Sequence, residues 1–267
     1  MRLPMPGGQR FSGLRLLAVL ALVALLQPFC PLRAQSHYQL GVGTTNILDT
    51  YLSQEKFHGV GLSLLTTTDR VRDGRRWLAS WQHQTHVSKA EDRAGNSSTV
   101  EAMYKFHYGR YCRLSAPGQP LELHAGLMGN AGIGMIYNTR NGNNPVQARL
   151  GLHLSPSARA RYTFNLFRHA AQVRYQADLP LVGVVFSPNY GQSYYELFTL
   201  GNYDHNIVPT TFVSAPNFRQ QLSLLYTFAP RLTLSLGYLG DYQQQRVNNL
   251  KQHVVNHAFL VGIAKGL

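Results

Sequence analysis

A strict alternation of apolar and polar residues, longer than an ordinary strand of a globular protein, constrains this chain most. From Ala148 to Phe164 every even-numbered residue is apolar, and every odd-numbered residue is polar or glycine. Successive side chains of a β-strand point to opposite faces, so this segment has one apolar face and one polar face. A helix would spread its arginines and leucines over all sides. Since a mean globular strand has about 5–6 residues, we expect an unusually long strand here.

The same period of two recurs along the chain and predicts about ten strands, with twelve as the upper number. No run of 18 apolar residues follows residue 38, so this part contains no candidate for a membrane-spanning helix. We therefore predict an all-β fold, an antiparallel up-and-down barrel in a single domain over residues 35–267. The expected strands lie at about 38–45, 58–68, 77–88, 99–114, 120–137, 147–164, 171–187, 217–228, 231–246 and 253–267.

The expected connections and strand lengths are typical of a barrel that crosses an outer membrane. Connections at 46–57, 89–98, 138–146 and 188–216 are longer than those between them, and a meander places the two sets at opposite ends. A tilted strand of about 11 residues crosses about 26 Å, close to the apolar band of such barrels. We therefore predict a transmembrane barrel with apolar rows facing lipid. A soluble barrel with its apolar rows inward has the same alternation and is the alternative.

The N-terminus has the pattern of a cleaved signal peptide. Arg2, Arg10 and Arg15 precede an apolar run at 16–26, which is too short for a membrane span, and an alanine at position 34 supplies a cleavage site. We predict that residues 1–34 are removed on export and that the protein lies in the outer membrane of a Gram-negative bacterium. Its partners are then outer-membrane lipid and, during biogenesis, the barrel-assembly machinery.

Charge and cysteine content exclude several other classes. The formal net charge is +13, but the basic residues are spread among the expected strands without a basic-aromatic module, so we expect no nucleic-acid partner. Two cysteines, one of them in the predicted signal peptide, cannot form a disulfide framework. Few of the histidines have ligand spacing, and we expect neither a metal site nor a cofactor.

Charged residues on the polar rows define a candidate lumen network. Ten strands leave little more interior room than eight, whose side chains nearly fill the barrel, so ion pairs are favoured over an open pore. A narrow pore with charge selectivity is the other interpretation. The predicted lumen residues are Glu101, Lys105, Glu122, Arg149, Arg159, Arg161, Arg174, Asp178 and Asp241.

The long connection at 188–216 holds the residue types of a hydrolase, in a pattern that does not specify one. Ser193 with His205 and Asp204 are candidates for a nucleophile, a base and its partner, but no Gly-x-Ser-x-Gly elbow is present. The alternative is a solvated loop over the barrel mouth. The candidate extracellular-loop residues are Asn141, Tyr190, Gln192, Tyr194, Tyr195, Glu196, Asp204 and His205.

Five segments resemble a known family. They are TNILDTYL at 45–52, YNTRNGNNP at 137–145, FSPNYGQSYYE at 186–196, GNYDHN at 201–206 and GYLGD at 237–241. The chain is similar over these segments to a Bacteroidales family known only as a domain of unknown function, whose members are exported β-barrel-like proteins. The resemblance implies a Gram-negative outer membrane and a barrel, and it implies no activity. The chain departs from the usual barrel ending, because Lys265 interrupts the last apolar row and Leu267 stands where an aromatic residue is usual.

The sequence thus favours an outer-membrane barrel without enzymatic activity, which serves surface binding, envelope integrity or a narrow pore. One alternative is a hydrolase or acyltransferase that acts on outer-membrane lipid. The other is a soluble periplasmic barrel that binds a ligand. The ligand itself is not specified by the residues.

Overall fold

A computed structural model describes residues 34–71, 76–229 and 232–266 of the chain. The predicted signal peptide at 1–34 lies outside the described residues except for Ala34, which begins the first strand. The strands are β1 (Ala34–Asp49), β2 (Phe57–Val71), β3 (Trp77–Asp92), β4 (Ser98–Arg113), β5 (Leu121–Asn138), β6 (Val146–Leu166), β7 (His169–Asp178), β8 (Val182–Phe186), β9 (Ile207–Thr211), β10 (Phe218–Ala229), β11 (Leu232–Val247) and β12 (Leu250–Lys265), with one short helix, α2 (Tyr194–Phe198).

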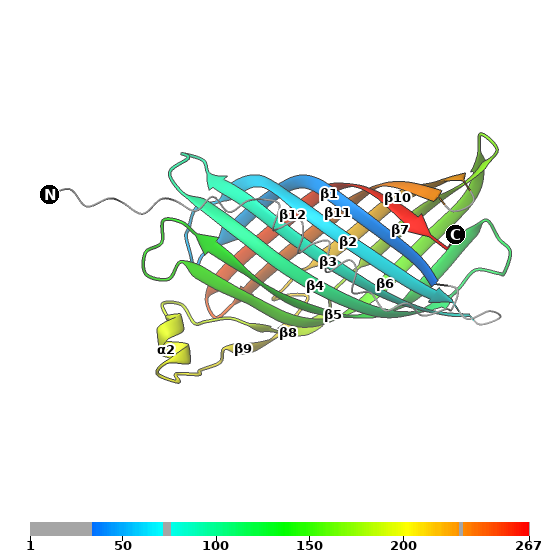
Figure 1. The fold of residues 1–267 in the computed structure, drawn as a ribbon. Helices are drawn as coiled ribbons and strands as arrows, with labels where there is room; N and C mark the ends of the chain where they lie inside the picture. The colour runs from blue at the N-terminus through cyan, green and yellow to red at the C-terminus, as the bar shows by residue number, and fades with distance from the viewer. Residues whose placement is uncertain (1–33, 72–75, 230–231, 267) are drawn as a thin grey trace. The chain divides into compact units, whose positions relative to one another are not determined.

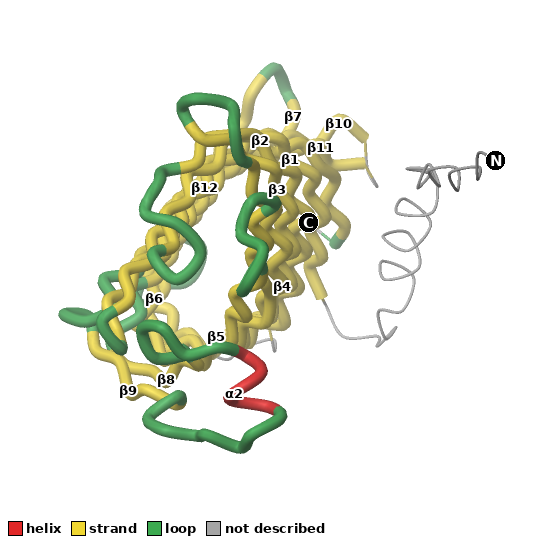
Figure 2. Tube along the Cα trace, turned by 90° about the vertical axis from the view of Figure 1, so that its left-hand side faces the viewer, coloured by secondary structure: helices red, strands yellow, loops and turns green. Residues whose placement is uncertain are grey.

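Ten of these strands form a closed antiparallel barrel, as predicted. The order around the ring is β1, β2, β3, β4, β5, β6, β7, β10, β11 and β12, and β12 pairs again with β1. Figure 2 shows the strands arranged in a ring, with the loops of one end toward the viewer. Closure leaves no free edge along the ring, so backbone N–H and C=O groups find partners within the sheet.

The apolar rows face outward and the polar rows face the lumen. Along β6 the outward Leu150, Leu152 and Leu154 are 42%, 57% and 46% exposed, whereas the inward Ser155 and Arg159 are 0% and 6% exposed. Register is fixed by this alternation, because a slip of one residue would move every apolar side chain into the lumen. The soluble alternative required the apolar rows inside, and the structure contradicts it.

The predicted strand at 171–187 is interrupted. Asp178 of β7 pairs with Ser157 of β6, and Val182 of β8 pairs with Leu154 of the same strand. Four steps along β7 and β8 therefore lie against three along β6, which is a β-bulge, and it contains Pro180, whose nitrogen cannot donate to a ladder.

The strand position next to β7 and β8 in the wall is interrupted as well. β9, within the predicted loop 188–216, pairs with β8, whereas β10 begins only at Phe218 beside β7. Residues 212–217 between them form no strand but follow the edge of β11, where Arg246 donates its backbone N–H to Ser214 (2.8 Å). In Figure 1, β8 and β9 lie along the lower side of the barrel, and α2 lies below its left-hand end.

The loops of the two ends differ less in length than expected. Strands continue to Asp49 and Asp92, so the connections 50–56 and 93–97 are shorter than predicted, and the turn at Asn248 and Asn249 has only two residues. Both asparagines have positive φ, 50° and 60°, as a two-residue hairpin turn requires. Only the segment 187–206 is long, and we call its end of the barrel the long-loop end and the other the short-turn end.

Two apolar groups fill part of the lumen. At the long-loop end, buried side chains from β1, β2, β3, β5, β12 and the connection 50–56 form an end plug that consists of Ile47, Leu52, Phe57, Ala90, Ile136 and Val254. A second group, the lumen apolar layer, consists of Leu65, Leu239, Ala258 and Leu260. Both exclude water from the barrel interior where they lie.

Substitution of Gly43 by valine should prevent closure of the barrel. Gly43 pairs with Ala258 at the seam of the first and last strands, and a Cβ there would overlap the carbonyl oxygen of His257. Backbone cannot yield as a side chain does, so the cost should exceed the ~1–3 kcal/mol that is typical of overpacking. We expect Gly43→Val to lose the compact, heat-modifiable form on unheated gels.

The control is Gly129→Val, because a Cβ at Gly129 has only the carbonyl oxygen of Tyr108 nearby, at 3.9 Å. Equal folded yields of the two variants would contradict the assigned register of β1 and β12.

Candidate functional site

The polar lumen is the candidate functional site. All nine charged residues predicted from the alternation lie at inward-facing positions, on β4, β5, β6, β7 and β11. Most of them are buried, and a buried charge needs an opposite charge or several hydrogen bonds to offset its lost hydration.

The centre of the lumen is crossed by bonds between opposite walls. Lys105 Nζ on β4 lies 2.6 Å from Asp241 Oδ2 on β11, and these two strands are opposite each other in the ring. Gln84 on β3 donates to the same carboxylate oxygen (2.7 Å) and accepts from Arg219 Nε on β10 (2.9 Å), again from across the barrel. These side chains therefore fill the lumen at this depth.

Two further ion pairs adjoin this centre. Arg219 Nη1 lies 2.8 Å from Asp178 Oδ2, and Arg149 Nη1 lies 2.5 Å from Glu101 Oε1. The carboxylate of Asp178 also accepts from Ser157 and Gln176, so its oxygens are fully occupied. We call Lys105, Asp241, Arg219, Asp178, Arg149 and Glu101 the mid-lumen cluster.

A second cluster lies toward the short-turn end. Asp69 of β2 accepts from Arg159 (3.0 Å) and from Arg161, both on β6. The guanidinium of Arg159 also stacks on the ring of Tyr111, 3.9 Å from its centroid. Arg174 donates to Gln35 (3.1 Å) and to a glutamine on its own strand.

The ninth predicted lumen residue, Glu122, is half-buried on the inward face of β5. The other eight predicted charges lie in two clusters rather than in one.

The sequence prediction missed two charges that complete these clusters. Asp69 lies one residue beyond the predicted strand 58–68, and Arg219 lies inside the predicted strand 217–228. Both continue the alternation, since Arg219 is inward between Phe218 and Gln220. The signal that identified the other nine residues was therefore present for these two as well.

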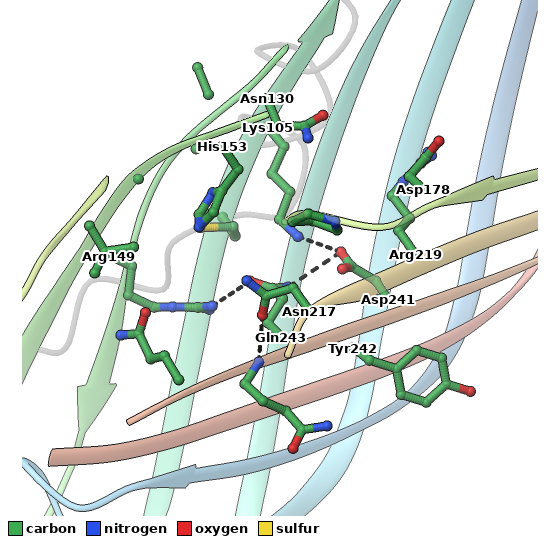
Figure 3. Close-up of a pocket in the computed structure, with 18 of the residues that line it drawn as sticks. Lys105, Asn130, Arg149, His153, Asp178, Asn217, Arg219, Asp241, Tyr242 and Gln243 are labelled. Carbon is green, nitrogen blue, oxygen red and sulfur yellow. Dashed lines mark hydrogen bonds and ion pairs between the residues drawn. The ribbon is translucent and has the colours of Figure 1, made fainter. Parts of the chain in front are cut away.

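A cavity of about 100 Å³ lies beside the mid-lumen cluster, and we call it the upper-lumen cavity. In Figure 3, Arg149 and His153 lie on one side of it, and Arg219 and Asp241 lie on the other. Residues from β4, β5, β6, β7, β8, β10, β11 and β12 line it, so it extends from the centre of the lumen toward the interrupted wall.

The long-loop end carries the predicted extracellular-loop residues. Asn141 lies in the connection 139–145 and donates to the backbone oxygen of Leu52 (3.1 Å). The others lie in 187–206, where Tyr190 and Tyr195 are exposed and Tyr194 packs edge-on against Tyr51. Burial raises the pKa of Tyr51 to about 12, and its hydroxyl donates to the backbone oxygen of Gln192 (3.0 Å).

Hydrogen bonds to side chains and to backbone groups hold the segment 187–206 against the barrel. Tyr194 donates to Gln147 Oε1 (3.0 Å) and accepts from the backbone N–H of Ala148 (2.7 Å). From the β11–β12 turn, Asn248 donates to the backbone oxygens of Ser187 (3.1 Å) and His205 (3.0 Å). The segment is therefore anchored over the barrel mouth at two places.

The hydrogen bonds of Ser193 are those of a helix N-cap. Its hydroxyl accepts from the backbone N–H of Glu196 (3.2 Å), and the Glu196 carboxylate accepts from the backbone N–H of Ser193 (2.7 Å), which is a capping box at the start of α2. The backbone N–H and hydroxyl of Ser193 lower the pKa of Glu196.

The other two catalytic candidates form a separate pair. The imidazole of His205 contacts the carboxylate of Asp204, and both side chains are exposed. No hydrogen bond between the described residues joins Ser193 to His205, so the structure does not assemble the nucleophile and base that the residue types suggest.

Within the described ranges, no three His, Cys, Asp or Glu side chains converge in a way that would hold a metal ion. No helix in the same part of the chain is long and apolar enough to cross a membrane.

Comparisons with known proteins give fold likenesses and one family. No curated protein matches the chain significantly. Among solved structures it is similar to the translocator domain of autotransporter NalP from Neisseria meningitidis, with 11% identity, a TM-score of 0.41 and coverage of 95% of this chain and 94% of that one. It is also similar to outer membrane protease OmpT from Escherichia coli, with 8% identity, a TM-score of 0.45 and coverage of 87% and 96%.

A third similar structure is Ail, the attachment invasion locus protein of Yersinia pestis, with 9% identity, a TM-score of 0.32 and coverage of 86% and 98%. The model of the family described as protein of unknown function (DUF3316) matches residues 30–267, almost the whole chain, and the protein therefore belongs to this family.

Proposed function

We propose that this protein spans the outer membrane of a Gram-negative bacterium of the order Bacteroidales, as a barrel with a filled lumen that presents a surface-binding segment outside. Residues 1–34 direct export and are cleaved, and the barrel-assembly machinery inserts the mature chain. The role is not enzymatic. The filled lumen is the part of this proposal with the most direct support, from the side chains that bond across it between opposite strands.

The outward face supports a lipid environment. Large apolar side chains are exposed on adjacent strands all around the ring, for example Leu62 on β2, Ile133 on β5 and Leu236 on β11, at 54%, 57% and 51%. Soluble monomers rarely expose contiguous apolar patches above a few hundred Å². In a bilayer the same surface is favourable, because acyl chains replace water around it.

Several exposed aromatic side chains lie near the strand ends, although others, such as Tyr104 of β4, lie in the middle of a strand. Trp77, Tyr162 and Phe228 lie at the short-turn end, and Tyr137 lies at the long-loop end. Outer-membrane barrels place aromatic residues at both membrane interfaces, where an amphipathic ring is favoured. This distribution supports a membrane span that runs between the two ends.

The interior supports a barrel that does not conduct solutes freely. The mid-lumen cluster joins opposite walls, and the end plug and the lumen apolar layer occupy other parts of the lumen. With charges paired and apolar groups packed, no hydrated ion crosses without breaking these contacts. Segment 187–206 is the longest of the connections at the long-loop end, and we propose it as the binding surface.

A charge placed on the outward face should reveal the membrane by its dependence on depth. Leu40, 54% exposed, lies near the middle of β1, whereas Val60, 70% exposed, lies near the long-loop end of β2. In a bilayer, Leu40→Arg should cost about 2–4 kcal/mol of folding free energy and Val60→Arg about 0–1 kcal/mol. The measurement is reversible unfolding in lipid vesicles, with membrane fractionation and heat-modifiable migration of the wild type alongside. Equal small costs for both variants, or a wild type that stays in the soluble fraction, would rule out the membrane assignment.

Single-channel recording should find the wild-type barrel closed. Because Lys105 and Asp241 bridge opposite walls, truncating both to alanine removes a contact that fills the lumen without leaving one charge unpaired. We expect no conductance steps from the wild type and discrete steps from the Lys105→Ala, Asp241→Ala double variant in planar bilayers. Regular ion-conducting steps from folded wild-type protein would show an open pore instead. Lys89→Ala with Glu91→Ala, an exposed pair, is the matched control.

A further inference from the structure

The upper-lumen cavity extends to the interrupted part of the wall. It is lined by Val185 and Phe186 of β8 on one side of the interruption, and by Asn217 and Phe218 on the other. β8 pairs with β9 and not with β10, so no regular ladder closes the wall between these residues.

The lining residues alternate in the direction they face. Arg149, Arg219 and Asp241 face the lumen, but their neighbours Leu150 and Phe218 face outward and also line the cavity. The cavity therefore has a polar part in the lumen and an apolar side at the interrupted wall.

The polar part has more hydrogen-bond donors than its own carboxylates use. Asp241 accepts from Lys105, Gln84 and Gln243, and Asp178 accepts from three other side chains. Arg219 is only 4% exposed, and its Nη2 has no hydrogen-bond partner among the described residues.

Unpaired buried donors are costly, because they have lost water without gaining a protein acceptor. His153 also lines the cavity, and its Nε2 is buried without a partner in the described structure. His107 is not a further donor, because its Nδ1 donates to Asn130 Oδ1 (2.6 Å) and the Nε2 of its neutral ring then carries no proton. A ligand that carries oxygen atoms would accept from Arg219 Nη2 and from the Nε2–H tautomer of His153.

We infer that the upper-lumen cavity binds the anionic oxygen head group of a single-chain amphiphile, such as a long-chain carboxylate, which enters from the membrane through the interrupted wall. The inference rests on the membrane placement proposed above. Arg219, with Lys105 beside it, receives the head group, and Leu150, Val185 and Phe218 contact the start of the chain.

The size of the cavity requires the chain to leave it. Its volume of about 100 Å³ is below the ~150 Å³ of a cavity that holds benzene, so it takes a head group and a few carbons only. The rest of the chain must pass through the interrupted wall into lipid. Affinity should therefore depend on chain length, which separates this site from one for a free small anion.

The test is photo-crosslinking of the full-length exported barrel in lipid nanodiscs, with palmitate that carries a diazirine next to its carboxylate. We expect crosslinks to map to the lining segments at 103–107, 149–153 and 217–219, and unlabelled palmitate to compete where butyrate does not. Butyrate that competes equally well would overturn the lateral route, and crosslinks confined to outward residues away from the cavity would overturn the site.

Two variants test the cavity itself. A Cβ at Gly151 would point at the ring of His153 (3.0 Å) and the side chain of Val185 (3.4 Å), so Gly151→Leu fills the cavity. Gly129→Leu, on the open outward face, is the matched control. We expect Gly151→Leu to reduce crosslinking about tenfold or more, a loss of about 1.4 kcal/mol in binding, and the control to match the wild type.

Arg219→Lys keeps a cation for Asp178 but removes the unpartnered Nη2, so it should also reduce crosslinking in a barrel that still migrates as folded. Unchanged crosslinking in folded Gly151→Leu and Arg219→Lys would overturn the inference. Failure of the proposed function is distinguishable, because it would show as loss of the membrane fractionation and heat-modifiable migration of the wild type.

Discussion

The structure depends on closure of the backbone ladder. When β12 pairs with β1, ten strands become a ring in which each strand has a hydrogen-bonded neighbour on both sides. A ring also defines an inside and an outside, so the alternation along each strand becomes a partition of the whole molecule. Gly43 contributes directly, because only a residue without a side chain allows the two ends of the sheet to approach there.

Closure then dictates the chemistry of the lumen. Side chains that would be solvated on an open sheet are enclosed, and each charge needs a partner from another strand. The partners come from across the barrel, as Lys105 finds Asp241, rather than from the same hairpin. Glutamines such as Gln84 join the pairs into a network, since an amide donates and accepts at once. The interior is therefore a packed polar core inside an apolar surface, the reverse of a soluble protein.

One irregular region of the described wall combines several unusual features. The bulge at 179–181 separates β8 from β7, and the irregular segment 212–217 separates β9 from β10, while β8 stays paired with β6. Side chains replace part of the lost ladder, as when Asn217 accepts from the backbone N–H of Gln244 (2.7 Å). The upper-lumen cavity and its unpartnered donors lie beside this region. Irregular pairing and incomplete hydrogen bonding at one place are the features that single this region out as a binding site.

Period two in the sequence determined the barrel, the number of its long strands and the face on which each residue lies, because side-chain direction along a strand depends only on local backbone geometry. The same pattern placed Arg149, Lys105 and Asp241 on the lumen rows, and it extended to Asp69 and Arg219, which were overlooked. Only the tertiary structure decided which charges meet, because partners such as Lys105 and Asp241 are set by the position of strands around the ring. It also decided where the wall is interrupted, since the break between β8 and β10 depends on pairing between segments, which residue spacing does not encode.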